Sequence, residues 1–406
     1  MEWKNIKTQF INNKFLAILL FGNVTTKIGN IVFNILLVKW LLEKTGTAYA
    51  SGVVMGFSLL PTLIFGLFSG VIVDTFSKKY ILVLTDFLNA IICFLIGLVV
   101  LGNNVNIPLL SLAVFLIGAN NTLFGPAFRS ILPEILGKEN MVSINSIFAL
   151  ASQLSSVIAP MLAGVLMISV NLSITSIFLI NAITFLCSSL CELMLPYKKR
   201  KEEKKEIKIF QNIYQGFSYI KGVTWLFFLL ITASLVNIFI AGYDLMLPFY
   251  LREIYADTDG RLFSIALTVE AVAGIVAALV QSKFGKKINF DLWLYLLLVG
   301  ISAFFIGNNV TIYLSLLGVF LFNFFLVFFN INFFAKVQTE VDSQFIGRTF
   351  SIIFLLANLS MPFSKYIFAY VNISILPYIF TIIGLGIASV SLLSNNKRKV
   401  LKNDNL

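Results

Sequence analysis

The chain has 406 residues, of which 58% are hydrophobic and only 12% are charged, and its mean hydropathy is +0.92. An ordinary soluble domain carries roughly 25% charged residues, so the composition excludes a soluble enzyme and indicates a membrane protein with many spans. The net charge of +11 does not point to nucleic acid, because the basic residues fall between the apolar runs, a distribution typical of membrane topology.

The residues that carry much of enzyme chemistry are absent or lie in apolar sequence. There is no histidine, and the three cysteines, Cys93, Cys187 and Cys191, all lie inside apolar runs. This excludes His-based catalytic triads, His-ligated zinc or haem sites and a disulfide framework. The sequence has no phosphate-binding loop ending in Gly-Lys-Ser/Thr, so ATP hydrolysis is not expected. We therefore expect no enzyme activity, no metal site and no cofactor.

Twelve apolar runs of about 18 or more residues predict an all-α fold of twelve transmembrane helices. The first run begins at Phe15 and has no small-x-small cleavage site, so we predict a retained helix rather than a signal peptide. In chain order the spans lie near residues 15–40, 48–73, 80–101, 108–131, 142–169, 173–195, 223–250, 261–282, 290–306, 311–335, 348–370 and 374–394.

The basic residues predict the side of the membrane on which each loop lies. One set of alternate loops contains little beyond Lys44, Arg252 and Arg261. The other set, which includes both ends of the chain, is rich in basic residues: Lys4, Lys7, Lys14, Lys78, Lys79, Lys138, the run 198–208, Lys283, Lys286, Lys287, Lys397, Arg398, Lys399 and Lys402. By the positive-inside rule, both termini are cytoplasmic.

The segment 196–221 separates six predicted spans from the other six. Its run KKRKEEKKEIK, at residues 198–208, holds seven basic and three acidic residues. We favour a solvated connector that fixes the topology over a binding site for anionic lipid headgroups. The expected organisation is an N-terminal six-helix bundle (1–195), a cytoplasmic linker (196–221) and a C-terminal six-helix bundle (222–406).

An internal repeat supports this division. The sequence DTFSKK (74–79) follows the second span, and SKFGKK (282–287) follows the eighth span 208 residues later. Two similar six-helix halves in parallel are the plan of a class of transporters in which the binding site lies near the bilayer midplane between the halves. The repeat therefore favours a transporter of a small-molecule substrate.

Polar residues at membrane depth are candidate substrate ligands, because a charge at the bilayer centre costs at least about 2.5 kcal/mol. In the first span, one helix face carries four such residues at the spacing i, i+4, i+7 and i+11: Asn23, Lys27, Asn30 and Asn34. We expect this face to line a wet cavity, and interhelical hydrogen bonding is the alternative. The other candidates are Asn120 and Asn121 in the fourth span, Asn237 in the seventh and Asn330 in the tenth.

Two carboxylates at membrane depth are candidate proton carriers. Since histidine is absent, proton coupling must use carboxylates, and Glu270 and Asp244 look like almost the only ones available there. Glu270 lies near the middle of the eighth span and is the first candidate; Asp244 lies in the outer part of the seventh span and is the second. A static salt bridge from Glu270 to Lys27 or Lys365 is an equally weighted alternative.

The residues Gly70, Asp74, Lys78 and Lys79 follow a pattern of a glycine, three residues, an aspartate and a short basic turn. This pattern resembles the first-half signature of the major facilitator superfamily, although Thr75 and Ser77 stand where the family usually has an arginine and a glycine. The resemblance implies two six-helix halves and a polar latch that breaks and re-forms during gating. A basic turn that only sets the topology is the alternative, but it leaves Asp74 unexplained.

The fifth span resembles a signature of drug:proton antiporters in this superfamily, in which spaced small residues end in Gly-Pro-x-x-Gly-Gly. The matching residues are Ser146, Ser155, Ala159, Pro160, Ala163 and Gly164. Small residues permit close helix contact and proline bends a helix, so we include Pro160 and Gly164 among the gating residues. The resemblance implies export rather than import.

Two stretches, Gly125–Leu136 and Thr339–Ile352, look like the macrolide-efflux and siderophore-exporter branch of the superfamily. Many members have an arginine early in the fourth span, but residues 109–119 are uncharged here. Arg129 lies nearer the cytoplasmic end, and we group it with the gate.

The resemblance implies a monomeric transporter in the cytoplasmic membrane of a bacterium, which exchanges protons for a hydrophobic or amphipathic compound such as a macrolide. An apolar cavity with a few polar groups, for which 41 Phe and 13 Tyr supply abundant wall, suits such substrates. Export of a siderophore, small peptide or lipid is the alternative on the same fold. A non-transporting membrane receptor or assembly partner is the alternative from another class.

Overall fold

A computed structural model describes residues 14–45, 48–58, 60–100, 106–169, 173–195, 197, 209–257, 261–285, 291–308, 311–369, 371 and 373–403. Within these residues every regular element is a helix. Ten described helical stretches are long and apolar enough to cross a membrane, and two shorter apolar stretches are Leu292–Ile306 and the first part, Ile346–Leu359, of a longer helix. The expected all-helical membrane protein is confirmed.

Some of the predicted topological signals lie outside the described residues. They are Lys4, Lys7, the run 198–208, and Lys286 and Lys287 at the end of the second-half repeat. The orientation of the termini and the role of the linker therefore stay predictions.

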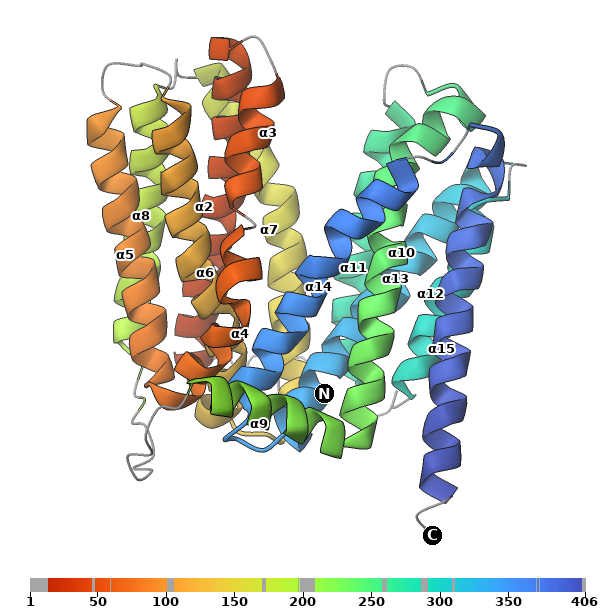
Figure 1. The fold of residues 1–406 in the computed structure, drawn as a ribbon. Coiled ribbons are helices and arrows are strands. Elements are labelled where there is room, and N and C mark those ends of the chain that lie inside the picture. Colours follow the sequence, from red (N-terminus) through yellow and green to blue (C-terminus); the bar gives the residue numbers. More distant parts are fainter. Residues whose placement is uncertain are drawn as a thin grey trace. The chain divides into compact units, whose positions relative to one another are not determined.

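The chain divides into two compact units, of which the first comprises Met1–Glu139, Ala151–Gly216 and Glu340–Leu355. Figure 1 shows α2, α5 and α8 side by side in this unit. Its helices are α2 (Lys14–Thr45), α3 (Ala48–Phe57), α4 (Leu60–Thr75), α5 (Lys78–Val99), α6 (Ile107–Leu136) and α8 (Ile174–Leu193), with the greater part of α7 (Met141–Ser169), the beginning of α9 (Ile209–Gly222) and the beginning of α14 (Ile346–Ala369).

The core of the first unit is apolar and tightly packed between these helices. Leu37, Leu41, Cys93 and Phe178 belong to its buried cluster. The ring of Phe178 meets that of Phe33 edge-on, with 5.1 Å between the centroids. Cys93 thus lies in the core, as expected for a small apolar residue.

The second predicted span is interrupted rather than continuous. α3 ends at Phe57, and the Ser58 backbone N donates to the Met55 carbonyl in a turn before α4 begins at Leu60. Pro61 lacks an N–H and therefore cannot continue the hydrogen bonds of α3, but it is tolerated in the first turn of a new helix, which explains the break. The interruption packs on α6, where a Cβ at Gly118 would lie only 2.6 Å from the Ser58 carbonyl oxygen.

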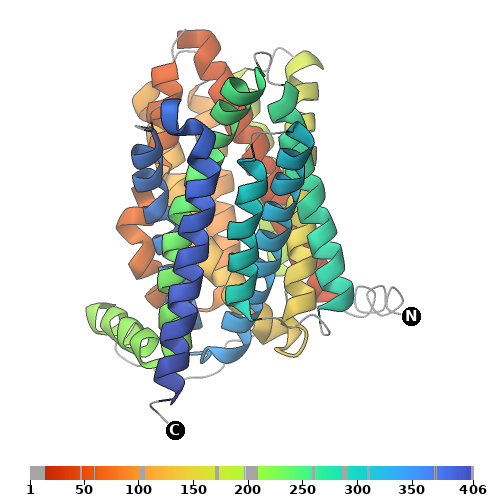
Figure 2. The same cartoon turned by 90° about the vertical axis from the view of Figure 1, so that its right-hand side faces the viewer.

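The second unit comprises Asn140–Leu150, Phe217–Thr339 and Leu356–Leu406. In Figure 2, α15 runs alongside α10 and α12. Its other helices are α11 and α13, together with the first part of α7 and the later parts of α9 and α14. The bounds are α10 (Thr224–Tyr255), α11 (Arg261–Phe284), α12 (Leu292–Ile306), α13 (Ile312–Glu340), the short 3₁₀ helix η1 (Ile373–Tyr378) and α15 (Ile379–Asn403). The last predicted span therefore begins as a 3₁₀ helix, which contains Pro377.

Aromatic side chains form much of the second unit's core. The rings of Tyr243 and Phe322 stack with 4.3 Å between centroids, and Phe380 meets Tyr250 edge-on at 4.9 Å. α12 and α15 approach closely, because a Cβ at Gly300 would lie 2.9 Å from the Gly384 carbonyl oxygen. Glycine at this contact is the small-residue packing typical of membrane helices.

Candidate functional site

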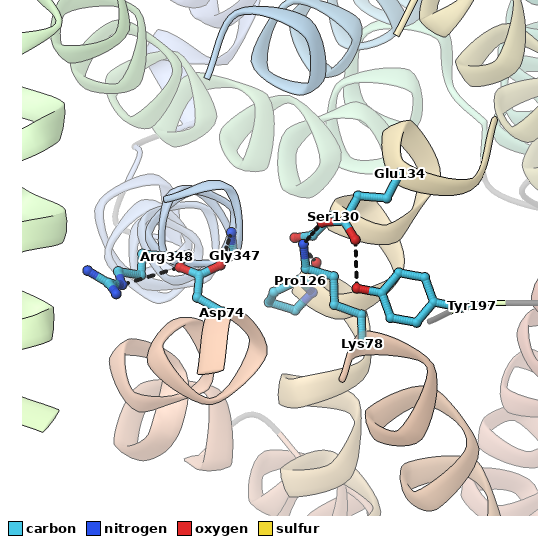
Figure 3. Close-up of polar contacts among 8 residues, drawn as sticks. All are labelled: Asp74, Lys78, Pro126, Ser130, Glu134, Tyr197, Gly347 and Arg348. Atoms are coloured by element: carbon cyan, nitrogen blue, oxygen red, sulfur yellow. Dashed lines mark hydrogen bonds and ion pairs between the residues drawn. The ribbon is translucent and has the colours of Figure 1, made fainter. Parts of the chain in front are cut away.

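The side chain of Asp74, at the end of α4, caps the beginning of α14 (Figure 3). Its Oδ1 accepts a hydrogen bond from the backbone N of Gly347 at 2.7 Å, and its Oδ2 accepts one from the backbone N of Arg348 at 3.1 Å. The Arg348 Nε lies 3.2 Å from the same Oδ2. Free N–H groups and the positive end of the helix dipole both stabilise an anion here. The carboxylate thus holds the first turn of α14 against α4.

Gly70 makes this contact sterically possible. A Cβ at Gly70 would lie 2.6 Å from the Arg348 Cα and 3.0 Å from the Ser351 Cβ. One residue away, the hydroxyls of Ser69 and Ser351 lie 2.8 Å apart in a hydrogen bond. The structure therefore brings Gly70 and Asp74 together with residues of the stretch Thr339–Ile352, which the sequence pattern singles out separately.

The two lysines of the basic turn make separate contacts. Lys78 is buried and forms an ion pair with Glu134 on α6, whose Oε2 accepts a hydrogen bond from the Tyr197 hydroxyl at 2.6 Å (Figure 3). The Lys79 Nζ donates to the Leu195 carbonyl at 2.6 Å. These contacts tie the start of α5 to α6 and to the chain that follows α8.

The other predicted gating residues lie on α6 and α7. Arg129 is half-buried on α6, close enough to Lys27 to act on it electrostatically. On α7, Ala159 and Ala163 are buried in the core of the first unit, whereas Pro160 is exposed. A Cβ at Gly164 would meet no atom within 4 Å in the described structure. The alanines, not Gly164, therefore make the close helix contact of this signature.

The polar face of α2 is only partly buried. Asn23, Lys27 and Asn30 are half-buried and Asn34 is exposed. Lys27 donates a hydrogen bond to the Ser152 hydroxyl on α7. This arrangement leaves polar groups accessible along one side of the helix, which suits the predicted cavity lining.

The asparagines on α6 form a small network with α5. The Asn120 Nδ2 donates to the Asn89 Oδ1 at 2.7 Å, and the Asn89 Nδ2 donates to the Asn121 Oδ1 at 3.4 Å. Asn89 is fully buried, whereas Asn121 is exposed. Asn120 thus helps to hold the two helices together, and Asn121 presents its side chain at the surface.

In the second unit, Glu270 on α11 accepts a hydrogen bond from the Tyr243 hydroxyl on α10. Asn323 on α13 also bonds to Glu270, and the exposed Asp244 lies close enough to act on it electrostatically. Asn237 is half-buried on α10 and Asn330 is exposed on α13. The structure therefore groups both predicted proton carriers with a phenol and an amide.

The alternative of a static salt bridge from Glu270 stays a prediction. Lys27 is engaged by Ser152 in the first unit. The side chain of Lys365 lies outside the described residues. Tyr243, which no sequence pattern singles out, bonds to the Glu270 carboxylate, as Asn323 does.

Comparison with known proteins identifies the family. The sequence model described as Major Facilitator Superfamily matches residues 19–365. The chain belongs to this superfamily. It is 20% identical to macrolide efflux protein A of Streptococcus pyogenes, covering 84% of this chain and 85% of that protein, and 26% identical to the staphyloferrin A transporter of Staphylococcus aureus, covering 80% and 76%. The expected likeness to the macrolide-efflux and siderophore-exporter branch is confirmed.

Solved structures of membrane transporters have the same fold. The crystal structure of a bacterial homologue of the iron transporter ferroportin, in an outward-facing state, matches with a TM-score of 0.78 at 15% identity. The match covers 94% of this chain and 98% of that chain. Membership of the superfamily, shown by the match over residues 19–365, makes this chain a membrane transporter rather than an enzyme.

Two buried carboxylates of this superfamily member do not stand out in the sequence. Asp86 on α5 and Glu192 on α8 are 0% and 2% exposed. Both lie inside the predicted spans 80–101 and 173–195, so Glu270 and Asp244 are not almost the only carboxylates at membrane depth, and that expectation was wrong. Both lie near the ends of their spans, next to basic loops, where charged residues are common. The signal that marks them in the sequence is a charge within an apolar run.

Proposed function

We propose that this protein exports hydrophobic or amphipathic compounds, such as macrolide-like drugs, in exchange for protons. The proposal includes twelve spans, both termini in the cytoplasm, a location in the cytoplasmic membrane of a bacterium and a monomeric protein. Its halves, 1–195 and 222–406, would give alternating access to a site near the midplane. The similarity to macrolide efflux protein A over 84% of this chain supports the substrate class.

The surroundings of Glu270 are the observation that supports proton exchange. Its carboxylate is bonded by a phenol and an amide, and another carboxylate, that of Asp244, lies nearby. A phenol can donate to the ionised acid and accept from the protonated one, so both forms of Glu270 keep a partner. A carboxylate with this surrounding can take up and release a proton without losing its hydrogen bond.

The cap of Asp74 on α14 supports the gating part of the proposal. Its contacts are polar and join two helices that are 271 residues apart in the chain, counted from Thr75 at the end of α4 to Ile346 at the start of α14. Such contacts can break and re-form as alternative states of a transporter interconvert. The gating role extends to Lys78, Lys79 and Glu134, which join neighbouring helices at the same end of α5.

Export of an anionic compound such as a siderophore is the second candidate. Lys27 and Arg129 place two cationic groups near one another in the first unit. Such a pair would attract a substrate carboxylate or phosphate. Reversal of the charge in a Lys27→Glu variant should abolish export of an anionic substrate and leave export of neutral drugs unchanged.

The test is transport into energised inverted membrane vesicles that contain the full chain. A panel of macrolides and other amphipathic drugs is added, and proton release from the vesicles is followed with a pH-sensitive dye. We expect substrate-dependent proton movement in the wild type and none in the Glu270→Gln variant. Glu253→Gln is the matched control, because Glu253 is an exposed carboxylate on α10, next to Arg252.

Two results would contradict the proposal. If no compound of the panel moves protons in vesicles in which the protein is present and folded, proton exchange is wrong for this substrate class. If the Glu270→Gln variant moves protons as the wild type does, Glu270 does not carry them.

A further inference from the structure

Asn89 is a buried amide near the middle of α5 that the proposed transport mechanism does not yet use. Its side chain is 0% exposed. Its Oδ1 accepts a hydrogen bond from the Asn120 Nδ2 at 2.7 Å, and its Nδ2 donates to the Asn121 Oδ1 at 3.4 Å. Burial of an amide among apolar helices is costly unless both its donor and its acceptor are bonded. Two consecutive residues of α6 therefore provide the partners that keep Asn89 in the interior.

These bonds orient the two asparagines of α6 in opposite ways. The Asn120 amide turns its NH₂ group toward Asn89, whereas the Asn121 amide turns its oxygen toward Asn89. The NH₂ group of Asn121 is thereby left free, and within the part of the chain that the structure describes it donates to no other residue. Asn120 is half-buried and Asn121 is exposed. The polar group that α6 presents to a solute is therefore a hydrogen-bond donor.

The position of Asn121 on α6 indicates a wet cavity rather than lipid. The exposed leucines Leu112 and Leu116 precede it by nine and five residues, which places them about 180° and about 140° around the helix from Asn121. Large apolar side chains are those that a helix exposes to lipid, whereas an unbonded N–H group in hydrocarbon is costly. Asn121 also lies in the middle of α6 (Ile107–Leu136), away from either end. We therefore expect the exposed amide to face water or a solute.

We propose that Asn89 is a positioning residue of the substrate site, which holds Asn121 so that its NH₂ group donates to a carbonyl, ether or hydroxyl oxygen of the exported compound. The substrate class is then neutral amphipathic molecules rich in such acceptors, of which macrolactone rings are an example. A donor that is already oriented loses less conformational entropy when a ligand binds. Asn89 thus strengthens binding of acceptors and leaves apolar contacts unchanged. The inference rests on the proposed function, since it concerns the same substrates.

The test is equilibrium binding of two radiolabelled probes to the purified full-length protein in lipid nanodiscs, without a proton gradient. Erythronolide B, a neutral macrolactone ring without sugars, offers many oxygen acceptors, whereas tetraphenylphosphonium is an apolar organic cation without an acceptor. We expect Asn89→Leu and Asn121→Leu each to weaken binding of the macrolactone about fivefold, the loss of one neutral hydrogen bond, and to change binding of tetraphenylphosphonium by less than about twofold.

A double variant separates positioning from a general structural role. If Asn89 acts only through Asn121, Asn89→Leu should have no further effect on macrolactone binding once Asn121→Leu is present. The matched control is Asn181→Leu. Asn181 on α8 is 1% exposed and donates to the Cys93 Sγ on α5 at 3.7 Å, but within the described structure it has no hydrogen bond to Asn121. This control loses a buried amide from the same unit, and its binding of both probes should be unchanged.

Asn89→Asp tests the orientation with little change in volume. The protonated acid can accept from Asn120 and donate to the Asn121 Oδ1 as the amide does, so macrolactone binding should match the wild type at low pH. The ionised acid can only accept, so Asn121 turns its NH₂ group toward it and binding should weaken as the pH rises. Every titratable group of the wild type, including Asp86 one turn earlier on α5, is present in this variant. The ratio of the two dissociation constants at each pH therefore isolates the introduced acid.

Three results would overturn the positioning role. They are equal weakening of both probes by Asn89→Leu, additive losses in the double variant, and a ratio for Asn89→Asp that does not change with pH. If all variants bind the probes as expected but the wild type shows no substrate-dependent proton movement, the proposed function is contradicted and the role of Asn89 in binding is retained.

Discussion

The carboxylates of Asp74 and Glu270 have very different hydrogen-bond partners. Asp74 accepts from two backbone N–H groups of α14 and pairs with the Arg348 guanidinium. Glu270 accepts from the Tyr243 hydroxyl and is bonded by Asn323, with the Asp244 carboxylate nearby. The first set offers only donors and so favours the ionised acid, whereas the second set includes a hydroxyl that can partner both the ionised and the neutral acid.

The same functional group therefore has two different surroundings within one fold, one made of donors only and one that includes a phenol. Donors that cannot accept a hydrogen bond, such as N–H groups and guanidinium, suit an anion. Donors that can also accept, such as a phenol, suit an acid that changes its state. Variants that replace each carboxyl by an amide of similar shape test this contrast directly.

The largest effect is expected for Asp74→Asn compared with Glu270→Gln. The amide introduced at position 74 would turn an NH₂ group toward the N–H donors of α14, and the loss of one partner of a buried ion pair costs about 3–5 kcal/mol. The amide introduced at position 270 still accepts from Tyr243, so less than about 1 kcal/mol should be lost. Denaturant unfolding of the purified variants in detergent measures both, and equal losses would refute the contrast.

A second pair of variants tests the steric part of the Asp74 contact. Gly70→Ala introduces a Cβ 2.6 Å from the Arg348 Cα and should cost about 1–3 kcal/mol, the range for overpacking. Gly164→Ala is the matched control, because a Cβ there meets no atom within 4 Å. We expect its unfolding free energy to change by less than about 1 kcal/mol, in the favourable direction, since alanine is the better helix former. Equal melting temperatures for both variants would argue against the close contact.

Tyr243→Phe tests the other side of the comparison. It removes the hydroxyl that bonds to Glu270 but keeps the ring stacked on Phe322, so the free energy of unfolding should fall by about 1 kcal/mol. Drug-dependent proton movement should fall as well. The control Tyr255→Phe loses a hydroxyl contact with Ser315 in the same unit and should keep normal proton movement. If both variants transport alike, Tyr243 has no role in proton exchange.

The smallest change in unfolding free energy is expected for Tyr197→Phe, at the Glu134 side chain. Tyr197→Phe removes the hydrogen bond to Glu134 but leaves its ion pair with Lys78. Since Glu134 is accessible to solvent, the free energy of unfolding should fall by only about 0.5 kcal/mol, which is within the range of exposed charge interactions. Replacement of Lys39, which pairs with Glu43 at the surface, gives the baseline for an exposed contact. A loss above about 2 kcal/mol would mean that Tyr197 is part of the latch itself.

The candidate residues that a short sequence pattern marks could be predicted from the sequence. Gly70 and Asp74 followed from a spacing, and Glu270 from a charge in the middle of an apolar run. The partners could not be predicted, because Arg348 lies 274 residues after Asp74 in the chain and Tyr243 lies on a different helix from Glu270. Gly164 shows the converse, since a residue that fits a signature makes no close contact here.

The sequence by itself determined that the protein is a helical membrane protein, because the lengths and composition of apolar runs reflect the bilayer directly. It also determined where most charges lie. Only the tertiary structure decided what each buried carboxylate faces: the start of α14 for Asp74, a phenol for Glu270, and the Thr26 hydroxyl of α2 for Asp86. The reason is physical, since the state of a buried acid depends on donors and charges within a few ångströms, and folding draws these from distant parts of the chain.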